Sequence, residues 1–600
     1  MRIKGLDYIR VLGIFLVVFY HFFSNFIPGG FLGVNILFVL SGFLITYHLL
    51  DEIYKNKEID IRKFYYKRFV RIFPPVLLMV FLTSLFCFFI NKDYSVRFFD
   101  QFISAISFNY NIFEIVRGGS YEGQFIRQLF MPTWSLAIEV HFYLLWPLVL
   151  TLIVNKFKSI KHYEKKYSSL LMKICICLYF ISYLLMIFLV ISSKDKISFV
   201  YFYDFTRMGS FIMGAFVGCF VKRFSYKQIP YLKPTAIFSV ILIVFSFIFS
   251  YNNKSTYTLA FILTDFITAL MILVSYSNKN IEEKKIINKL SMYSYGIFIF
   301  HWPSFVIITS VFDNFFGVIL AVLVTALLVL VNFHLFEPLF NGKDIYLGEK
   351  FFNNKKIIYE NNKMIIQIFL VLIFSSSITM AYILDKKADD MVSIEKTILE
   401  KSIKQDIDKI KMDKNLLDMA IKKSENKEVT NENNDVMINV LADSVLLGNR
   451  EMIQENIPNI YVNAEGSRPI DSASDLINQM KKEGKLGSVV VIALGTNAIK
   501  DPKESLEEII KAIPQKTRLI LVTCYDNRYK QPHRVSVAMR EISKKYDFIT
   551  LMDWEKEAMA HPEYYSGTDG VHYFGRLNVY DAYLKMLKNS IDQSLKNKAK

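Results

Sequence analysis

Residues 31–46 read FLGVNILFVLSGFLIT, a stretch whose few polar side chains are all uncharged. With its continuation to residue 50, it is long enough to cross the hydrocarbon core of a bilayer, which takes about 20 residues of α-helix. Such windows recur over roughly the first two-thirds of the chain and predict a polytopic α-helical membrane domain with about eleven spans. An aromatic-rich stretch near 98–116 is expected at the membrane interface or as a re-entrant piece. The predicted spans lie near residues 7–27, 31–50, 72–90, 134–154, 170–191, 200–221, 234–250, 256–275, 291–311, 317–336 and 364–384.

The formal net charge of +16 at pH 7 is unevenly distributed along the chain. Lys and Arg crowd the even-numbered connections between predicted spans, as in residues 55–71 and 156–166, whereas most odd-numbered connections are short and hold few. Because basic loops stay on the cytoplasmic side, this pattern predicts a multi-pass protein of the cell membrane with a cytoplasmic N-terminus and an extracellular C-terminal domain. The charge is therefore a sign of topology, and it predicts the lipid bilayer, not nucleic acid, as a partner.

Cysteine usage indicates neither a disulfide framework nor a metal site. The chain has five cysteines; all but Cys524 fall in predicted spans, so the exported part holds a single thiol. A disulfide within that part would need a second cysteine, and no His/Cys cluster has the spacing of metal ligands. We therefore expect no bound metal and no resident cofactor.

The last third of the chain has a different composition. Residues 385–435 are rich in Lys, Asp, Glu and Asn and are expected to form an extracytoplasmic linker, an exposed helix followed by flexible chain. Beyond them, short apolar segments alternate with amphipathic ones, which predicts a three-layer α/β domain with a parallel sheet over residues 436–600. In such a sheet the active site lies at the carboxyl ends of the strands. The predicted strands are 436–442, 460–464, 488–494, 518–523 and 548–551.

Polar motifs in this domain predict a nucleophilic site. Ser444 follows the first predicted strand in LADSV, Asn497 follows the third in GTN, and DGVH carries Asp569 and His572. A serine hydroxyl becomes a nucleophile when an imidazole removes its proton and a carboxylate holds that imidazole in the right tautomer. Asp569 can reach His572 from the same turn. Amide hydrogens near Ser444 and Gly466, with the side-chain amide of Asn497, are expected to stabilise a tetrahedral oxyanion.

The motifs ADSV, AEGSR, GTN and DGVH occur in the order of the blocks of the SGNH hydrolases, and this domain resembles that family. The chain has Ala442 where the family usually has glycine before the first aspartate. This change is also found in peptidoglycan O-acetyltransferase-type domains, so it favours a transferase. A helix-capping serine or a surface histidine would explain any one of these residues, but not all four in this order. The resemblance places the Ser, Gly, Asn and His of the family at Ser444, Gly466, Asn497 and His572.

Two ionisable side chains, Arg10 and His21, interrupt the first predicted span. Their spacing of eleven residues, at about 100° each, returns to nearly the same helix face about 16 Å further along. Ionisable groups within a span are costly in lipid, so we expect this stripe to line a polar cavity. A lone buried histidine is more often a packing residue, and the shared stripe argues against that interpretation.

The Arg-x10-His spacing resembles the acyltransferase-3 family, and other motifs of that family follow in order. The resemblance covers residues 1–340 and leaves 341–384 as a cytoplasmic loop and a last transmembrane helix. Together with the C-terminal domain, the chain resembles the peptidoglycan O-acetyltransferases. One departure is Asn35, where the family commonly has aspartate, so a carboxylate charge is missing at this position. The motifs are residues 31–46, KRFVRIFPP at 67–75, TWSLAIE at 133–139, YSYGIFIFHWP at 293–303 and FEP at 336–338.

The acyltransferase-3 resemblance implies cytoplasmic acetyl-CoA as the acyl donor substrate. Arg68 and Arg71 are expected at the inner membrane face, where guanidinium groups could hold the phosphates of the donor. Ordinary positive-inside anchoring would also explain both residues. His21 is the candidate base for acyl acceptance or relay. Further candidates for donor binding or relay are Arg10, Glu139 and His301.

The sequence therefore predicts a two-part O-acetyltransferase. The membrane domain takes acetyl from acetyl-CoA inside, Ser444 becomes acetylated outside, and the acetyl passes to a cell-wall glycan. The muramoyl (MurNAc) C6 hydroxyl of peptidoglycan is the preferred acceptor, and another surface polysaccharide is the alternative. An exported, membrane-anchored carbohydrate esterase is a second alternative, although about eleven spans with Arg and His inside exceed what an anchor needs. A non-enzymatic transporter or sensor that binds glycan is a further alternative, but it would leave the triad without a role.

Overall fold

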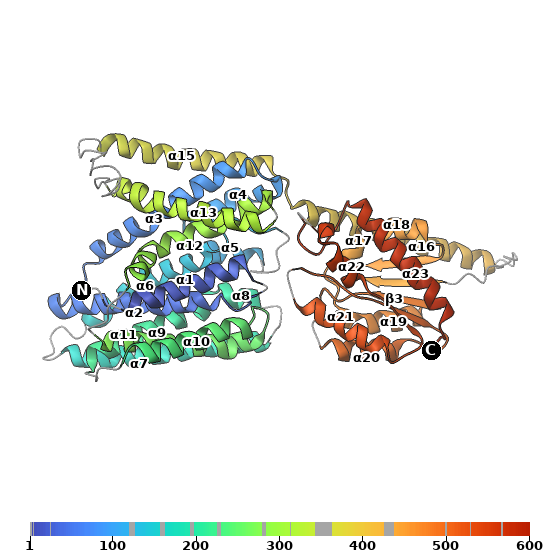
Figure 1. Ribbon diagram of the computed structural model, residues 1–600, viewed down its shortest axis with the longest axis horizontal. Coiled ribbons are helices and arrows are strands. Elements are labelled where there is room, and N and C mark those ends of the chain that lie inside the picture. The colour runs from blue at the N-terminus through green and yellow to red at the C-terminus, as the bar shows by residue number, and fades with distance from the viewer. Residues whose placement is uncertain are drawn as a thin grey trace. The chain divides into compact units, whose positions relative to one another are not determined.

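The computed structural model describes Ile3 and residues 5–24, 26–118, 126–155, 163–192, 197–224, 230–278, 284–312, 314–341, 363–424, 437–497, 501–527, 530–565 and 568–600. These residues form two compact units, Met1–Asp390 and Met391–Lys600, called here the membrane unit and the C-terminal unit (Figure 1). The membrane unit is entirely helical over its described residues, and the C-terminal unit combines helices with a parallel sheet.

The membrane unit is a bundle of long helices joined by short ones. Its elements are α1 (Leu6–Phe22), α2 (Leu32–Asn56), α3 (Ile61–Cys87), η1 (Lys92–Ser95), α4 (Phe98–Ile106), α5 (Tyr110–Arg117), α6 (Thr133–Asn155), α7 (Tyr163–Ser192), α8 (Ile197–Phe202), α9 (Asp204–Arg223), α10 (Leu232–Ile248), η3 (Thr256–Ala260), α11 (Phe261–Ser277), α12 (Lys285–Val311), α13 (Phe315–Val331), η4 (Asn332–Phe336), α14 (Glu337–Phe340) and α15 (Lys363–Lys387).

Among the described residues, eight helical stretches are long and apolar enough to cross a membrane. Helices also occupy the other three predicted spans: α1 and α10 have 17 residues each, and α9 carries Arg207 in its interior. The aromatic-rich stretch near 98–116 forms α4 and α5, which are too short to span. The chain is thus a multi-pass membrane protein. The eight stretches are Leu32–Asn56, Ile61–Cys87, Thr133–Asn155, Lys166–Ser192, Thr256–Ser277, Lys285–Val311, Phe315–Phe340 and Met364–Lys387.

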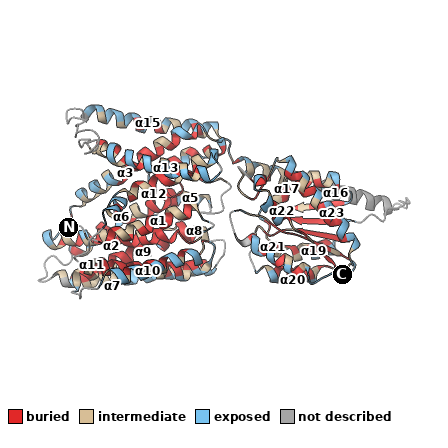
Figure 2. Ribbon diagram, in the orientation of Figure 1, coloured by how far each residue is buried: buried red, intermediate tan, exposed pale blue. Residues whose placement is uncertain are grey.

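Large apolar side chains remain exposed on the outer helices of this unit. Phe180 on α7, Leu323 on α13 and Leu372 on α15 are each more than half exposed. Pale blue marks exposed residues along these three helices in Figure 2. Exposed apolar side chains in such numbers are unusual on a soluble monomer. Lipid tails are as apolar as leucine, so a bilayer removes the cost of exposing these faces.

Helix α2 lies at the centre of the bundle, in contact with α1, α6, α9 and α11. Glycine allows its close approach to α9, because a Cβ atom added at Gly214 would overlap the carbonyl oxygen of Val39. A Cβ atom added at Gly42 would likewise overlap the carbonyl oxygen of Phe211. Small residues at crossing points let membrane helices pack backbone to backbone, which replaces the hydrophobic drive that lipid does not supply.

We expect Gly214→Leu to prevent the membrane unit from folding, since its side chain would force α9 away from α2. Overpacking a tight core costs about 1–3 kcal/mol or more. The measurement is the fraction of full-length protein that elutes as a monodisperse detergent complex, with Ser375→Leu as the control because that serine is exposed on the surface of α15. Equal monodisperse fractions for the two variants would contradict this account of the α2–α9 contact.

The C-terminal unit contains one five-stranded sheet flanked by helices. Its elements are α16 (Ser393–Ser424), β1 (Ile438–Ala442), α17 (Ser444–Leu447), α18 (Arg450–Asn456), β2 (Ile460–Ala464), η6 (Ile470–Ser472), α19 (Ala473–Lys482), β3 (Val489–Ala493), α20 (Pro502–Ala512), β4 (Arg518–Val522), α21 (Lys530–Ser543), β5 (Ile549–Met552), α22 (Trp554–Ala560), η7 (Pro562–Tyr565) and α23 (Leu577–Lys596).

All strand pairs are parallel, and the strand order is β2-β1-β3-β4-β5. Alternate side chains of each strand enter two separate cores. Val440 of β1 packs with residues of α17, α18 and α23, whereas the next residue, Leu441, packs with residues of α19, α20 and α21. The sheet is thus covered on both faces, and the predicted three-layer α/β architecture is confirmed. The order reverses between β1 and β3, the point at which such sheets place their ligand sites.

Helix α16 packs against this sheet. The side-chain amide of Gln405 donates to the carbonyl oxygen of Ala464 at 2.6 Å and accepts from its amide nitrogen at 2.8 Å. Ala464 ends the edge strand β2, so Gln405 satisfies backbone groups that an exposed edge would leave unpaired. Lys401 and Lys404 form ion pairs with Glu451 on α18. The range 385–435, predicted as a linker, therefore contains a helix that belongs to the C-terminal unit, and its end at 425–435 lies outside the described residues.

Candidate active sites

Ser444, His572 and Asp569 form one chain of contacts in the C-terminal unit. Ser444 begins α17 directly after β1, and its Oγ lies 2.8 Å from Nε2 of His572. Nδ1 of His572 lies 2.7 Å from Oδ2 of Asp569. The carboxylate can only accept, so Nδ1 carries the proton and Nε2 is left to accept the serine proton. This is the arrangement that makes a serine hydroxyl nucleophilic.

The loop that holds His572 is fixed by Asp569, the carboxylate of the same contact chain. Oδ1 of Asp569 accepts hydrogen bonds from the backbone amides of Val571 at 3.1 Å and His572 at 2.8 Å. Both carboxylate oxygens of Asp569 are thus used within one turn. Ser444 and His572 are buried to 8% and 5% exposure, so little water competes for the Ser444–His572 bond.

A second carboxylate, Asp443, lies beside the nucleophile. Its Oδ1 accepts from the amide of Val445 at 3.1 Å, and its Oδ2 accepts from the hydroxyl of Thr496 at 2.5 Å. Burial raises the pKa of the Asp443 carboxyl, and the hydrogen bond from Thr496 opposes that rise. Asp443 thus joins the loop after β1 to the loop after β3, and it holds Ser444 at the start of α17.

The predicted oxyanion residues follow neighbouring strand ends. The last residue of β1, Ala442, pairs with Ala464 of β2 and with Ala493 of β3. Gly466 and Asn497 come shortly after these two strand ends, as Ser444 comes after Ala442, so all three lie at one edge of the sheet. Nδ2 of Asn497 also lies 3.1 Å from Oγ1 of Thr496, which ties its amide to the Asp443 loop.

We expect Asn497→Ala to lower the rate of acyl transfer by the C-terminal unit on the order of 10²–10³-fold, the usual cost of one lost oxyanion donor. The measurement is turnover of a soluble acetyl ester by the full-length protein in detergent. Asn456→Ala is the matched control, because that exposed asparagine only donates to a carbonyl within α18. A rate within about threefold of the unsubstituted protein would remove Asn497 from the oxyanion site.

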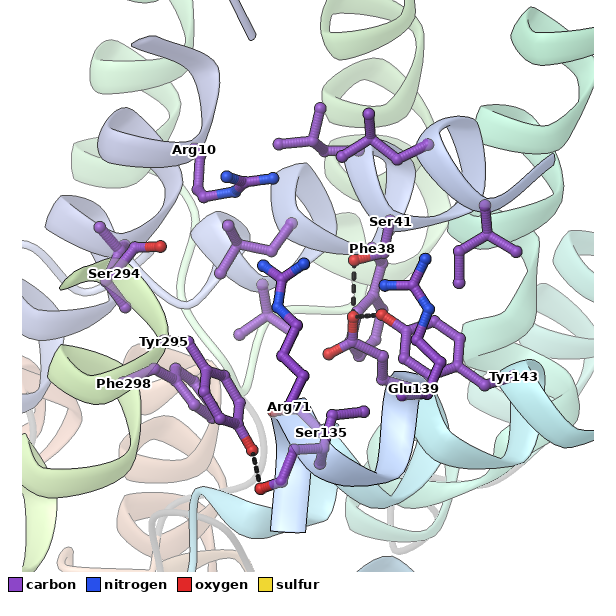
Figure 3. A pocket seen from close by; sticks show the side chains of 18 residues that line it. Arg10, Phe38, Ser41, Arg71, Ser135, Glu139, Tyr143, Ser294, Tyr295 and Phe298 are labelled. Carbon is purple, nitrogen blue, oxygen red and sulfur yellow. Dashed lines mark hydrogen bonds between the residues drawn. The ribbon is translucent and has the colours of Figure 1, made fainter. Parts of the chain in front are cut away.

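A cavity of about 120 Å³ lies among α1, α2, α3, α6 and α12 of the membrane unit. The guanidinium groups of Arg10 and Arg71 point into the same space in Figure 3, with Glu139 on its other side. Positive charge predominates, because three arginines and one carboxylate line the cavity. Its polar lining residues are Arg10, Ser41, Arg68, Arg71, Ser135, Glu139, Tyr143, Ser294 and Tyr295.

Glu139 is held in place by two hydroxyl groups. Ser41 donates to its Oε1 at 2.6 Å, and the Tyr143 hydroxyl donates to the same oxygen. The guanidinium of Arg68 lies 5.3 Å from the centre of the Tyr143 ring, within cation–π range. These contacts fix the side of the cavity opposite Arg10 and Arg71.

A second, larger cavity of about 430 Å³ shares Arg10, Arg71, Ser294 and Tyr295 with the first. On this side Arg10 donates to the hydroxyl of Ser291 at 3.1 Å, and Ser291 donates to Asp7 at 2.6 Å. Arg10 and Arg71 therefore line both the larger and the smaller cavity. Such a junction can bind an anionic group in the larger cavity and hold a smaller group in the other.

His21 and His301 form a buried pair further along the same two helices. Nδ1 of His21 lies 2.6 Å from Nε2 of His301, and the rings are stacked with their centres 4.9 Å apart. Arg10 meets Ser291 and His21 meets His301 at nearly equal sequence separations, 281 and 280 residues. Helices α1 and α12 therefore run parallel, and the histidine pair lies about 16 Å beyond Arg10 along them.

The sequence analysis missed a buried polar cluster around Asn35. Arg207 donates to Oδ1 of Asn35 at 2.8 Å, and Nδ2 of Asn35 lies 3.4 Å from Asp265. Asp265 also accepts from Tyr183 at 2.5 Å and from Ser210 at 3.1 Å. The carboxylate of this cluster is therefore that of Asp265 on α11, next to the uncharged Asn35. Arg207 and Asp265 each lie inside a predicted span, a position that by itself indicates a buried polar partner.

The structure thus brings the candidate residues of the membrane unit into two groups. Arg10, Arg68, Arg71 and Glu139 line one cavity, whereas His21 and His301 pair outside its lining. Ser41 and Tyr143 complete the cavity and were not predicted. Tyr143 lies four residues after Glu139, on the same face of a helix, which was the signal available in the sequence.

Known proteins are similar to this chain over its first part and over nearly its whole length. Residues 3–335 match the acyltransferase-3 family, described as an acyltransferase domain. The chain belongs to this family. It is 26% identical to the O-acetyltransferase OatA of Staphylococcus aureus over 98% of this chain and 96% of that protein. It is also 26% identical to a second Staphylococcus aureus protein, named as a putative O-acetyltransferase, over 97% of each chain.

Among solved structures, the C-terminal catalytic domain of the Streptococcus pneumoniae peptidoglycan O-acetyltransferase A (OatA), with a methylsulfonyl adduct, is 26% identical to this chain. The match covers 28% of this chain and 99% of that domain, with a TM-score of 0.26. The family match and the full-length similarity to staphylococcal O-acetyltransferases make this chain a multi-pass membrane O-acetyltransferase.

Proposed function

We propose that this O-acetyltransferase carries acetyl across the membrane in two stages and that Ser444 is its covalent carrier outside. The observation that supports this most directly is the chain of contacts from Ser444 through His572 to Asp569, at 2.8 and 2.7 Å. A serine activated in this way forms an acyl ester that a second hydroxyl can cleave.

The chemistry at Ser444 then has two symmetric halves. His572 takes the proton of Ser444 as Oγ bonds to the acyl carbonyl carbon, and the departing carrier leaves with that proton. A glycan hydroxyl next attacks the acyl ester, and His572 takes the proton of that hydroxyl. The proton returns to Oγ of Ser444 as its bond to the acyl carbon breaks, and the acetylated glycan leaves. Asp569 stabilises the imidazolium in both halves.

Acetyl-CoA is the proposed donor, bound from the cytoplasmic side. The larger cavity, which shares Arg10 and Arg71 with the smaller one, suits the phosphate groups of the donor. The smaller cavity suits the acetyl end. His21, further along α1, is the proposed base that passes the acetyl outward. This direction requires a cytoplasmic N-terminus and an extracellular C-terminal unit, as the distribution of basic loops predicts.

Cell-wall glycan is the proposed acceptor, and within it the MurNAc C6 hydroxyl of peptidoglycan. This proposal rests on the resemblance of the whole chain to peptidoglycan O-acetyltransferases. O-acetylation of another surface polysaccharide is the alternative.

Mass spectrometry of muropeptides from cells with and without this protein separates these functions. We expect acetyl esters on MurNAc only when the protein is present. A higher ester content in cells that lack it would identify an esterase. An unchanged muropeptide pattern, with acetyl lost from a different polysaccharide, would move the acceptor to that polymer.

A further inference from the structure

The tautomer of His301 is fixed by the backbone of its own helix. Its Nδ1 lies 3.0 Å from the carbonyl oxygen of Ile297 and 2.8 Å from that of Phe298. Carbonyl oxygens only accept hydrogen bonds, so Nδ1 of His301 must carry the proton. In the neutral ring, Nε2 then holds the lone pair and acts as an acceptor.

This assignment fixes the tautomer of His21 in turn. Nε2 of His301 lies 2.6 Å from Nδ1 of His21, so the proton between them belongs to Nδ1 of His21. The lone pair of His21 is then on Nε2. His301 is fully buried and His21 is 9% exposed, which disfavours a charged imidazolium in the resting pair. Two neutral rings in this order satisfy the contacts on both nitrogens of His301.

We propose that His301 is a positioning residue that makes Nε2 of His21 the base for acetyl transfer. The proposal rests on the proposed function, in which His21 serves acetyl transfer from acetyl-CoA. It assigns to His301 the task that a carboxylate performs for the histidine of a serine triad: it accepts from Nδ1–H, holds the ring, and strengthens that bond when the ring becomes charged.

A neutral acceptor suits this location better than a carboxylate would. Burying a carboxylate among apolar groups is costly, whereas burying a neutral imidazole with both nitrogens hydrogen-bonded costs little. The pair also sits among aromatic rings, since Trp302 lies 4.8 Å from His21 and Phe22 lies 6.3 Å from His301, measured between ring centres. The rings around the pair limit the other orientations that His21 can adopt.

The proposed step needs one co-reactant, an acceptor hydroxyl group. A hydroxyl group gives its proton to Nε2 of His21 as its oxygen bonds to the thioester carbon, and the carbon–sulfur bond breaks. The proton then passes from His21 to the coenzyme thiolate, which leaves as a thiol. His301 neither gains nor loses a proton, because Nδ1 of His21 remains its donor throughout.

The test compares His301→Phe with His301→Gln in the full-length protein reconstituted in liposomes. Phenylalanine fills the space but accepts no hydrogen bond, whereas the glutamine carbonyl can accept from Nδ1–H of His21. The readout is coenzyme thiol released from acetyl-CoA, analysed as kcat and KM. His21→Ala is the reference for a lost base, and His334→Phe is the matched control at an exposed histidine.

We expect His301→Phe to lower kcat roughly 10²-fold or more, and His301→Gln to recover most of that loss. KM for acetyl-CoA should stay within about twofold in both variants, because His301 lies a helical turn beyond Phe298, the last α12 residue of the donor cavity. Equal activity of His301→Phe and unsubstituted protein, or no recovery with glutamine, would overturn the role of His301 while His21→Ala remained inactive. Absence of thiol release from the unsubstituted protein would instead overturn the proposed function.

Discussion

Ser444→Ala should abolish acetyl esters in the cell wall while the protein stays in the membrane at its normal amount. The alanine removes the only atom that His572 Nε2 deprotonates in the described triad. Loss of a triad nucleophile typically costs on the order of 10⁴-fold or more, because the remaining groups cannot form the covalent ester. Muropeptide mass spectrometry measures the ester content, and immunoblots of membrane fractions measure the protein.

The control for this substitution is Ser590→Ala, at a buried serine whose hydroxyl only donates to a carbonyl within α23. It removes the same atom from the same unit and should leave the ester content unchanged. Normal wall acetylation in cells that carry only Ser444→Ala would mean that acetyl reaches the glycan without this serine, and the two-stage transfer would have to be abandoned.

His21→Ala should stop the delivery of acetyl to Ser444 without disabling Ser444 itself. We expect the rate of acetyl transfer from acetyl-CoA to fall on the order of 10²–10⁴-fold, the range for a lost general base. The same protein in detergent should turn over a soluble acetyl ester at its normal rate, because the triad lies in a separate compact unit. Both rates are measured on one preparation.

His334→Ala is the control, since this exposed histidine meets the Tyr293 hydroxyl and lies away from the His21–His301 pair. If His21→Ala lost both activities, the residue would serve folding alone. If it lost neither, His21 would be a packing histidine.

The residues of the C-terminal site could be predicted because short motifs sit at strand ends. Each of Ser444, Gly466 and Asn497 follows an apolar strand, and parallel strands bring their carboxyl ends to one edge. Asp569 and His572 are close in sequence, so their contact needed no knowledge of the fold. The packing of α16 was not predicted, because its polar surface is typical of an exposed helix and Gln405 gives no sign of its partner on β2.

The membrane site could be predicted only in part. The stripe of Arg10 and His21 follows from helical periodicity, and ionisable groups inside spans indicate polar cavities. Which helices meet is set by contacts far apart in the sequence, such as His21 with His301 and Asn35 with Asp265. Hydropathy gives the length of a helix but not its neighbours, so the pairing of the two histidines required the structure.

The most direct test of the account is acetyl labelling of Ser444 from the opposite side of the membrane. Inverted membrane vesicles expose the cytoplasmic face, and radiolabelled acetyl-CoA is added outside them. We predict label on the peptide that contains Ser444, enclosed in the vesicle lumen, and none in vesicles that carry Ser444→Ala or His21→Ala. Label on Ser444 only when acetyl-CoA is supplied on the same side as the C-terminal unit would contradict transfer across the bilayer.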